Sequence, residues 1–262
     1  MFKKIILISI SIIFITLNAN AASDGELILK KNQPSEIKDC FENVNRATFK
    51  FNQLLDGIIF KPVAGAYRFL PTPVKSGVSN SLDNLSNLVT IPNNIIQGDI
   101  DKAVFNSGRL VLNTTIGIFG LIDVAQHLGL PEYEKEDYGQ SLATHGFGPG
   151  CYLVLPVLGP STIRDTAGSL LNVMGGDPWY NVTVNNSTQY FSDSDYYLSR
   201  LASGVDFRAK NYESIDNLEK NSVDFYASVK SLYLQDRQQK ILNSNGITES
   251  MDDSDWEEIE NQ

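Results

Sequence analysis

Residues 138–165 read YGQSLATHGFGPGCYLVLPVLGPSTIRD and combine the features on which a fold assignment for this chain depends. The centre, Cys151–Leu158, is almost purely apolar and is bracketed by glycine–proline pairs at 148–150 and 159–160. Pro156 lacks a backbone donor, which argues against a central strand or an uninterrupted helix. Because hydrocarbon cannot satisfy irregular backbone, such a run must be buried in protein or line a lipid-facing cavity. The polar residues 161–165 then indicate a capped helix start.

Length and charge limit the classes of protein that the chain can represent. Its 262 residues suffice for one large domain or two small ones with a substantial core. The formal net charge of −10 argues against nucleic acid as a partner, because phosphate binding needs a basic surface. The same charge disfavours electrostatic adhesion to anionic lipid headgroups. Any contact with a membrane is therefore expected to be apolar.

Residues 1–21 have the pattern of a secretory signal peptide. A basic start at Lys3 and Lys4 precedes the apolar run Ile5–Leu17, and the small residues 19–21 predict cleavage between Ala21 and Ala22. The apolar run is too short for an ordinary spanning helix. The mature chain is therefore expected to be exported, to a bacterial periplasm. No cysteine follows the cleavage site, so we expect no N-terminal lipid anchor there.

The chain has two cysteines, Cys40 and Cys151. In an oxidising compartment such a pair often forms a disulfide, and the alternative is two buried free thiols. The residues alone leave both open. A bond between them would close a loop of about 110 residues and contribute about 4–5 kcal/mol in the chain-entropy model.

Apolar residues at helical spacing predict that most of the remaining chain is helical. They mark helices at 41–58, 63–70, 74–89 and 99–113, a short piece from Pro92 to Gly98, and helices at 162–174 and 192–243 with a break near Asn221. Residues 22–38 are predicted to be a loose N-terminal arm, and 244–262 an acidic disordered tail. No series of alternating strands is visible. The sequence predicts an all-α single domain over residues 39–243.

Two segments have an apolar face whose environment matters for function. In 41–58 the stripe of Phe41, Val44, Phe51, Leu55 and Ile58 is expected, taken alone, to face the core. Residues 116–130 are apolar and glycine-broken, too short to span a bilayer, and could insert part-way, lie at the interface or form half of a buried hairpin. Asp123 is the only charge in that run, and a helix cap or an ion pair is its favoured role.

The sequence offers little that points to catalysis. It lacks the nucleophile elbow, the phosphate loop, the dinucleotide fingerprint and the zinc-protease motif. Its two histidines, His127 and His145, are too few for a histidine-rich metal site. A Cys151–His145 thiol dyad is the one conceivable nucleophile, and it lacks an obvious third member. We therefore expect no catalytic residues, no metal and no cofactor.

An ordered series of short motifs resembles the VacJ/MlaA family and covers about residues 40–243. The matching segments are 41–46, 61–64, 67–68, 77–80, 97–99, Arg109, 113–114, 117–118, 120–125, 137–140 and 148–165. Members of that family are helical outer-membrane proteins in the inner leaflet that form a ring with an amphipathic channel. They associate with trimeric porins and withdraw misplaced phospholipid from the outer leaflet, passing it to a soluble periplasmic carrier.

The resemblance implies the same function here: removal of mislocalised phospholipid, which maintains outer-membrane lipid asymmetry, without covalent chemistry. It implies a ring-like fold whose amphipathic helices turn apolar stripes toward lipid and polar faces toward the channel. The partners would be phospholipid, a porin, a periplasmic carrier and the outer membrane at its periplasmic side. Candidate residues for the lipid path or the embedded surface are Phe51, Gly117, Phe119, Gly120, Leu121, Asp123, Gly148, Gly150, Tyr152 and Leu153.

Two departures from the family pattern bear on this expectation. Family members usually carry a lipidated cysteine after the signal peptide, and this chain has none there. The positions of Cys40 and Cys151 are usually proline, which favours a bond between the two cysteines. The alternative functions are a periplasmic thiol hydrolase that uses Cys151 and His145, and a structural adaptor whose main contact is a porin.

Overall fold

The computed structural model describes residues 37–186 and 188–244 of the chain. All of them belong to one compact unit, Pro34–Gln262. The predicted signal peptide with its cleavage site at Ala21 and Ala22, the arm up to residue 36 and the tail from residue 245 lie outside the described residues.

The described chain is mostly helical, with one small two-stranded sheet, which confirms the predicted fold class. In chain order the elements are α3 (Glu42–Leu55), the π-helix η2 (Asp56–Phe60), α4 (Lys61–Arg68), α5 (Thr72–Gln97), α6 (Ile100–Thr115), α7 (Val124–His127), α8 (Tyr138–Thr144), strands β1 (Tyr152–Leu155) and β2 (Gly159–Thr162), α9 (Ile163–Leu171), η3 (Asn172–Gly176), α10 (Pro178–Tyr180), η4 (Asn181–Asn185), α11 (Asp193–Lys210), α12 (Tyr212–Asn221) and α13 (Phe225–Ser244).

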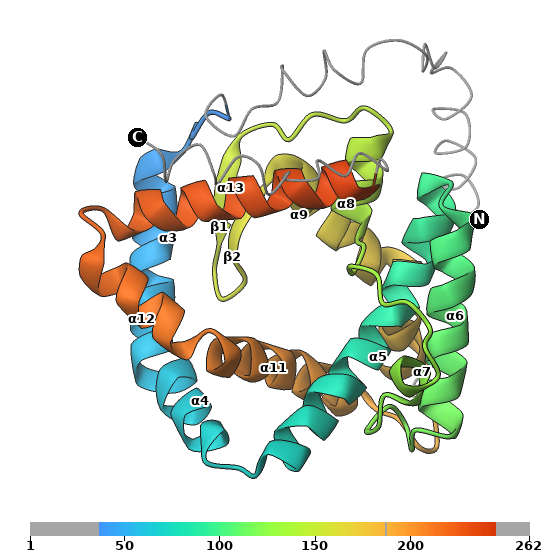
Figure 1. Ribbon diagram of the computed structural model, residues 1–262. Helices are drawn as coiled ribbons and strands as arrows, with labels where there is room; N and C mark the ends of the chain where they lie inside the picture. Colours follow the sequence, from blue (N-terminus) through green and yellow to red (C-terminus); the bar gives the residue numbers. More distant parts are fainter. Residues whose placement is uncertain (1–36, 187, 245–262) are drawn as a thin grey trace, which may run out of the picture. The chain divides into compact units, whose positions relative to one another are not determined.

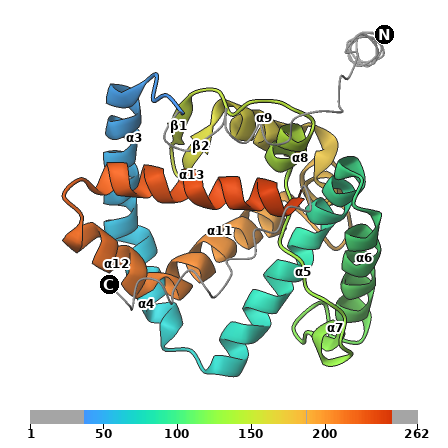
Figure 2. The ribbon, with the colours of Figure 1, turned by 45° about the horizontal axis from the view of Figure 1, so that its top comes forward.

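Contacts between these elements close into a ring-like circuit. Helix α3 packs on β1, β2 on α9, α9 on α8, α8 on α5, α5 on α11, and α11 on α4, which returns through η2 to α3. Helix α13 lies across the circuit against α8, β2 and α12 (Figure 1). The turned view shows the same sequence of neighbours, with α6 and α7 outside α5 (Figure 2). The ring-like arrangement that the family resemblance implies is therefore confirmed.

Helix boundaries follow local signals with two exceptions. The side chain of Asp99 caps α6 at the start of the helix expected at 99–113, and that of Thr162 caps α9 within the predicted capped start at 161–165; α12 ends at Asn221, the expected break. Pro62 and Pro92, however, do not separate helical pieces. The chain is continuously helical from Glu42 to Arg68, and α5 runs through Pro92 to Gln97. A proline within a helix removes one backbone donor, and the packing of α5 against α6, α8, α10 and α11 outweighs that loss.

The apolar run at 151–158 forms an antiparallel hairpin, which the sequence pattern did not predict. Strand β1 pairs with β2 from Tyr152 opposite Thr162 to Leu155 opposite Gly159. Pro156 lies in the turn, where a missing N–H costs no ladder bond, so the argument against a central strand holds. Half of the run is buried, since Tyr152 and Val154 are enclosed while Val157 and Leu158 are exposed.

Two asparagines on α3 hold the free edge of β1. Asn45 donates to the Tyr152 carbonyl at 3.0 Å and accepts from the Val154 amide at 2.9 Å. Further along the same face of the helix, Asn52 donates to the Leu155 carbonyl at 2.9 Å and accepts from the Val157 amide at 2.8 Å. Side-chain amides therefore replace a third strand, and they fix the register between hairpin and helix.

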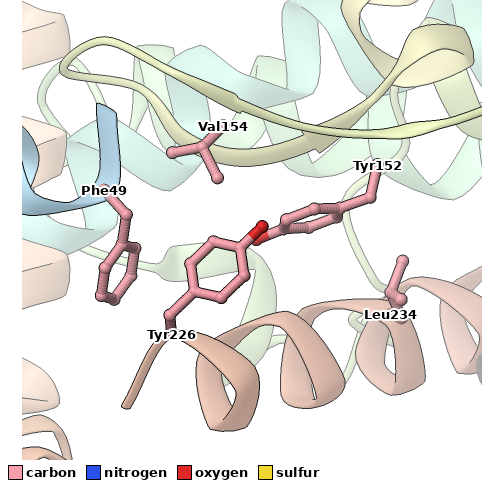
Figure 3. Packing of buried hydrophobic residues seen from close by; sticks show 5 residues of the cluster. All are labelled: Phe49, Tyr152, Val154, Tyr226 and Leu234. Carbon is pink, nitrogen blue, oxygen red and sulfur yellow. The ribbon is translucent and has the colours of Figure 1, made fainter. Parts of the chain in front are cut away.

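The hydrophobic core is a small cluster between the hairpin, α3 and α13. Figure 3 shows Tyr152 and Val154 from β1, Phe49 from α3, and Tyr226 and Leu234 from α13. The Phe49 and Tyr226 rings meet edge to face with centroids 5.4 Å apart. Each such side chain contributes roughly 1.5–3 kcal/mol on burial. This cluster joins the first, middle and last parts of the described chain.

Elsewhere the distribution of side chains is inverted, with polar groups inside and apolar groups outside. The buried positions of α5 are Gly77, Asn84, Asn87, Thr90, Asn93 and Asn94. Asn106 on α6 donates to Asn94 at 2.8 Å, so amides pair across the contact between these two helices. The stripe at 41–58 faces outward, because Phe41, Val44, Phe51 and Ile58 are exposed. The expectation that this stripe faces the core is wrong.

Cys40 and Cys151 form a disulfide with their Cα atoms 5.6 Å apart. The bond connects the chain just before α3 to the residue before β1, close to the Tyr152 amide, which donates to the Lys38 carbonyl at 2.9 Å. The cross-link therefore lies at the same edge of the hairpin that Asn45 holds.

We predict that the double substitution Cys40→Ser, Cys151→Ser lowers the free energy of unfolding by about 3–5 kcal/mol, because the unfolded chain gains the freedom of a long loop. Urea unfolding of the purified protein measures the loss, and a reductant should lower the wild type to the level of the variant. Mass spectrometry of unreduced peptides that finds both thiols free would contradict the bond.

An ionic cluster, buried at Asp165 and half-exposed at Asp137, ties α13 to α8 and α9. Arg237 donates two bonds of 2.6 Å to the Asp137 carboxylate and one of 2.9 Å to Asp165, which also accepts from Tyr233 at 2.7 Å. Burial alone raises the pKa of Asp165, but the charges of Arg237 and Arg164 and the bonds from Arg237 and Tyr233 outweigh it, so the pKa is lowered. Asp165 therefore stabilises the fold at neutral pH.

We predict that Arg237→Met lowers the free energy of unfolding by about 3 kcal/mol at pH 7, since it removes one of the two arginines that face the buried Asp165 and the arginine partner of Asp137. A carboxyl with a depressed folded pKa stabilises fully above its unfolded pKa of about 3.9 and loses that effect as pH falls through the folded value. Without the arginine, only Arg164 and Tyr233 lower the pKa of the Asp165 carboxyl and the depression is smaller, so the variant's deficit should shrink as the pH falls below about 4. Urea unfolding at several pH values measures this.

Gln239→Met on the same helix is the matched control, because it introduces the same side chain at an exposed, uncharged position. It should change the free energy of unfolding by less than about 0.5 kcal/mol at every pH. A deficit of Arg237→Met that stays constant with pH would refute the role of the two carboxylates.

Candidate functional site

The apolar loop, residues 116–122, follows the end of α6 and is the most distinctive surface feature of the chain. Its exposed side chains are Ile116, Ile118, Phe119, Leu121 and Ile122, and Phe119 is 75% exposed. In water this exposure of large apolar side chains is unfavourable, so the loop is suited to an apolar environment.

Most backbone amides of the apolar loop are bonded within the chain. The amides of Gly117, Phe119, Gly120 and Ile122 donate to the carbonyls of Leu112, Thr114, Asn113 and Gly117 at 2.8–3.1 Å. Leu121 donates to the Ile118 carbonyl at 3.2 Å. Hydrocarbon offers no partner to a backbone group, so a loop that inserts among acyl chains must bond its amides in this manner.

Close packing and left-handed backbone hold the loop in shape. Ile118 and Phe119 have φ values of 53° and 57°, which side chains with a Cβ rarely adopt, so the surrounding contacts must hold them. A Cβ on Gly120 would lie 2.8 Å from that of Asn84, and one on Gly117 only 2.2 Å from the Ile122 oxygen. Both glycines therefore allow close backbone approach.

Asp123 ends the loop and has both favoured roles at once. Its carboxylate caps α7 by accepting from the Gln126 amide at 3.1 Å, and it pairs with Arg109 at 2.6 Å and with Asn113 at 2.9 Å. Burial raises the pKa of Asp123, but the bonds from Asn113, Gln126 and Arg109 outweigh that effect and the pKa is lowered. This carboxylate fixes the loop to α6.

Further exposed apolar side chains occur on elements all along the described chain. Phe69 between α4 and α5 is 91% exposed, Leu158 at the hairpin turn 76%, and Met174 in η3 72%. Others lie on α11, at Leu198, Leu201 and Phe207. Together with the apolar loop and the α3 stripe, these side chains form what we call the apolar surface. In a typical water-soluble domain the large apolar side chains are buried and the polar ones exposed, so this distribution is the reverse.

The predicted site residues divide into three groups in the structure. Phe51, Phe119 and Leu121 are exposed and belong to the apolar surface. The glycines and Asp123 shape the backbone: Gly150, with φ of 70°, packs against Ile163, whereas Gly148 has open space around it. Tyr152 is fully buried in the core and does not belong to the exposed apolar surface, and Leu153 beside it is half-buried. An alternating strand hides every second residue, which the apolar run alone does not reveal.

The thiol dyad is ruled out by the disulfide. The Cys151 sulfur is bonded to Cys40 and provides no thiolate, while the His145 Nδ1 lies 2.8 Å from the Ser141 carbonyl. The thiol hydrolase hypothesis is therefore not supported, because the proposed nucleophile is not a free thiol. In the described ranges no three histidine, cysteine, aspartate or glutamate residues gather as a metal site would require. Within the same ranges, no helix has the length and apolarity needed to cross a membrane.

Sequence reasoning missed the asparagines that organise the interior. Asn45 and Asn52 are seven residues apart and so lie on one face of α3, and Asn84, Asn87 and Asn94 recur on one face of α5. A polar stripe of amides at helical spacing, opposite an apolar stripe, is the signal that could have identified the inward face.

The geometry agrees with comparisons to known proteins. A protein-family model described as MlaA lipoprotein matches residues 37–240. The chain belongs to this family. Among its relatives, the Intermembrane phospholipid transport system lipoprotein MlaA of Escherichia coli is 34% identical over 201 residues, which cover 75% of this chain and 76% of that protein. An uncharacterized protein of Rickettsia bellii is 35% identical over 208 residues, covering 79% and 78%.

A solved structure supports the family assignment in three dimensions. It belongs to work described as the structural basis for maintenance of bacterial outer membrane lipid asymmetry, and its chain matches with a TM-score of 0.67 at 30% identity. The match covers 78% of this chain and 99% of that one. The MlaA fold therefore extends over most of the described residues.

We predict that Gly117→Ala lowers the free energy of unfolding by about 1–3 kcal/mol, because its methyl group would overlap the Ile122 and Asn113 oxygens, at 2.2 and 2.5 Å. Thermal unfolding of the purified protein measures this. Gly148→Ala is the matched control: nothing lies within 4 Å of its Cβ position, so stability should stay within about 0.5 kcal/mol of the wild type. Equal stability of the two variants would contradict the packing of the loop.

Proposed function

We propose that this chain removes mislocalised phospholipid from the outer leaflet of the outer membrane and thereby maintains lipid asymmetry. The observation that carries the proposal is the apolar surface on a ring-like unit whose buried face is largely polar. Membership of the MlaA family supports it, since relatives are named as components of an intermembrane phospholipid transport system.

A phospholipid has two parts that need different surroundings, and the chain offers both. The apolar surface would sit among acyl chains, with the apolar loop inserted and most of its amides already bonded. Polar side chains of α5 that stay exposed, such as Asp83, would give the headgroup the polar partners that hydrocarbon lacks. A path with both kinds of wall lowers the barrier for lipid transfer.

Transfer along such a path requires no covalent step, and we propose that the protein is not an enzyme. Direction comes from the lower free energy of the lipid downstream, where the apolar pocket of a soluble periplasmic carrier hides the acyl chains from water.

We propose that the protein lies at the periplasmic side of the outer membrane after export, in contact with a trimeric porin. The negative net charge of −10 fits apolar retention better than adhesion to anionic headgroups.

The test is a pair of cationic substitutions in the apolar surface, Phe119→Lys and Leu158→Lys, made together. Each substitution replaces an exposed apolar side chain, so the stability of the variant in detergent should equal that of the wild type. Membrane binding should weaken more than tenfold, because the variant buries less apolar surface in the bilayer and must also bring two charges to it. Flotation with phospholipid vesicles measures binding, and labelling of outer-leaflet phospholipid in cells that lack the protein measures function. The variant should fail to restore asymmetry.

Asn221→Lys and Lys220→Met are control variants at exposed polar positions that should float and function as the wild type does. Normal lipid clearance by the double variant after full loss of flotation would refute the proposal. If the variant clears lipid poorly only when a porin is absent, the adaptor hypothesis is favoured instead.

A further inference from the structure

Two charged side chains on the polar side of α5 form no ion pair with any residue that the structure describes. Asp83 is on α5, and Lys135 is in the segment between α7 and α8. The fold brings them into one electrostatic neighbourhood, since each is the main opposite charge felt by the other. Their charged atoms nevertheless remain beyond the 4.0 Å of a salt bridge. A ligand that carries one negative and one positive group can bind between such a cation and anion.

Lys135 is held in place by a buried amide. Its ammonium donates one bond of 2.8 Å to Asn87 Oδ1, and Asn87 is only 2% exposed. Burial lowers the pKa of Lys135, against the attraction of Asp83 and Glu132. An ammonium has three donors, and within the described residues only this one is used. Lys135 is therefore positioned and partly dehydrated, with two donors left for a ligand.

Asp83 lies one helical turn before Asn87, on the same face of α5. The residue is exposed, and its carboxylate accepts no hydrogen bond from any described residue. Burial by the surrounding protein still raises its pKa, and attraction to Lys135 and Lys210 opposes that rise. The carboxylate is thus accessible and incompletely solvated, which favours a cationic partner.

The other charges of this neighbourhood are engaged with one another. Arg109 pairs with Asp123 at 2.6 Å and reaches Glu132 at 3.7 Å. Lys210 pairs with Asp206 at 2.9 Å. Within the described ranges, Asp83 and Lys135 are therefore the two charges of the group that remain available, one of each sign.

We propose that Asp83 and Lys135 form a headgroup site for a zwitterionic phospholipid with a primary amine, in which Lys135 binds the phosphate and Asp83 the ammonium. The proposal rests on the proposed lipid transport and names the class of lipid that the path prefers. A phosphoethanolamine headgroup carries both charges a few ångströms apart and supplies N–H donors for the carboxylate.

Other headgroups satisfy this site less well. An anionic glycerol headgroup would place its phosphate at Lys135 and leave Asp83 without a cation beside a negative ligand. A choline headgroup carries the positive charge but no N–H donor, so it cannot form the charge-assisted hydrogen bond. The order of preference expected is phosphoethanolamine, then choline, then phosphoglycerol.

The experiment is native mass spectrometry of the purified mature chain, equilibrated in bilayer nanodiscs with equal amounts of phosphatidylethanolamine, phosphatidylcholine and phosphatidylglycerol. The wild type should retain phosphatidylethanolamine over phosphatidylglycerol by about tenfold. Asp83→Asn should bring that ratio to about one, because it removes the carboxylate at an exposed position. Lys135→Met should weaken retention of all three lipids, and Lys135→Arg should restore it.

Asp101→Asn and Lys220→Met are matched controls, since they remove exposed charges elsewhere and should leave the ratio unchanged. Soluble glycerophosphoethanolamine separates a lipid site from a site for a free headgroup, because without acyl chains it should compete only at a large excess. Competition at equal concentration would overturn the lipid assignment. A wild-type ratio near one, or an unchanged ratio in Asp83→Asn, would overturn the headgroup site alone, whereas retention of no phospholipid would overturn the proposed function.

Discussion

The bonds between α3 asparagines and the edge of β1 are the interaction on which the described ring depends. A lone two-stranded hairpin is marginal, and its outer edge exposes donors and acceptors that a membrane cannot satisfy. The side chains of Asn45 and Asn52 bond to that edge, and the Lys38 carbonyl accepts a hydrogen bond from the Tyr152 amide. With the edge closed, β1 can place Tyr152 and Val154 against α13, so that one hairpin joins both ends of the circuit.

The polar interior follows from the same constraint. A unit that turns apolar side chains outward has few left for a core, so its helices must meet through amides and ion pairs that satisfy one another. The contact of Asn106 with Asn94 and the triad of Arg237, Asp137 and Asp165 are two such solutions. Each is directional, which fixes the angle between helices more tightly than apolar packing does. The result is a ring-like unit with a small hydrophobic core.

Much of this could be predicted from sequence, and the failures have a common physical origin. Helix starts at Asp99 and Thr162 were predictable because their caps are local. Helical spacing alone did not give the outward direction of the 41–58 stripe, because spacing shows that a stripe exists but not which solvent it faces. The hairpin was not predicted because Tyr152, which is buried, and Leu153, which is half-buried, are both apolar, so the sequence shows no alternation of polar and apolar residues. Among site residues, the exposed Phe119 was identified by its apolar run, while Asp83 and Lys135 required the fold to bring them together.

The disulfide imposes an order on assembly. Cys40 comes at the start of the described chain, and its partner follows 111 positions later. Helices α3 to α8 all lie within the enclosed segment, so oxidation cannot seal the hairpin edge until that whole segment has been delivered to one compartment. Any earlier closure would need a wrong partner, and the chain carries no third cysteine to offer one. The scarcity of thiols thus makes mispairing within a single molecule impossible.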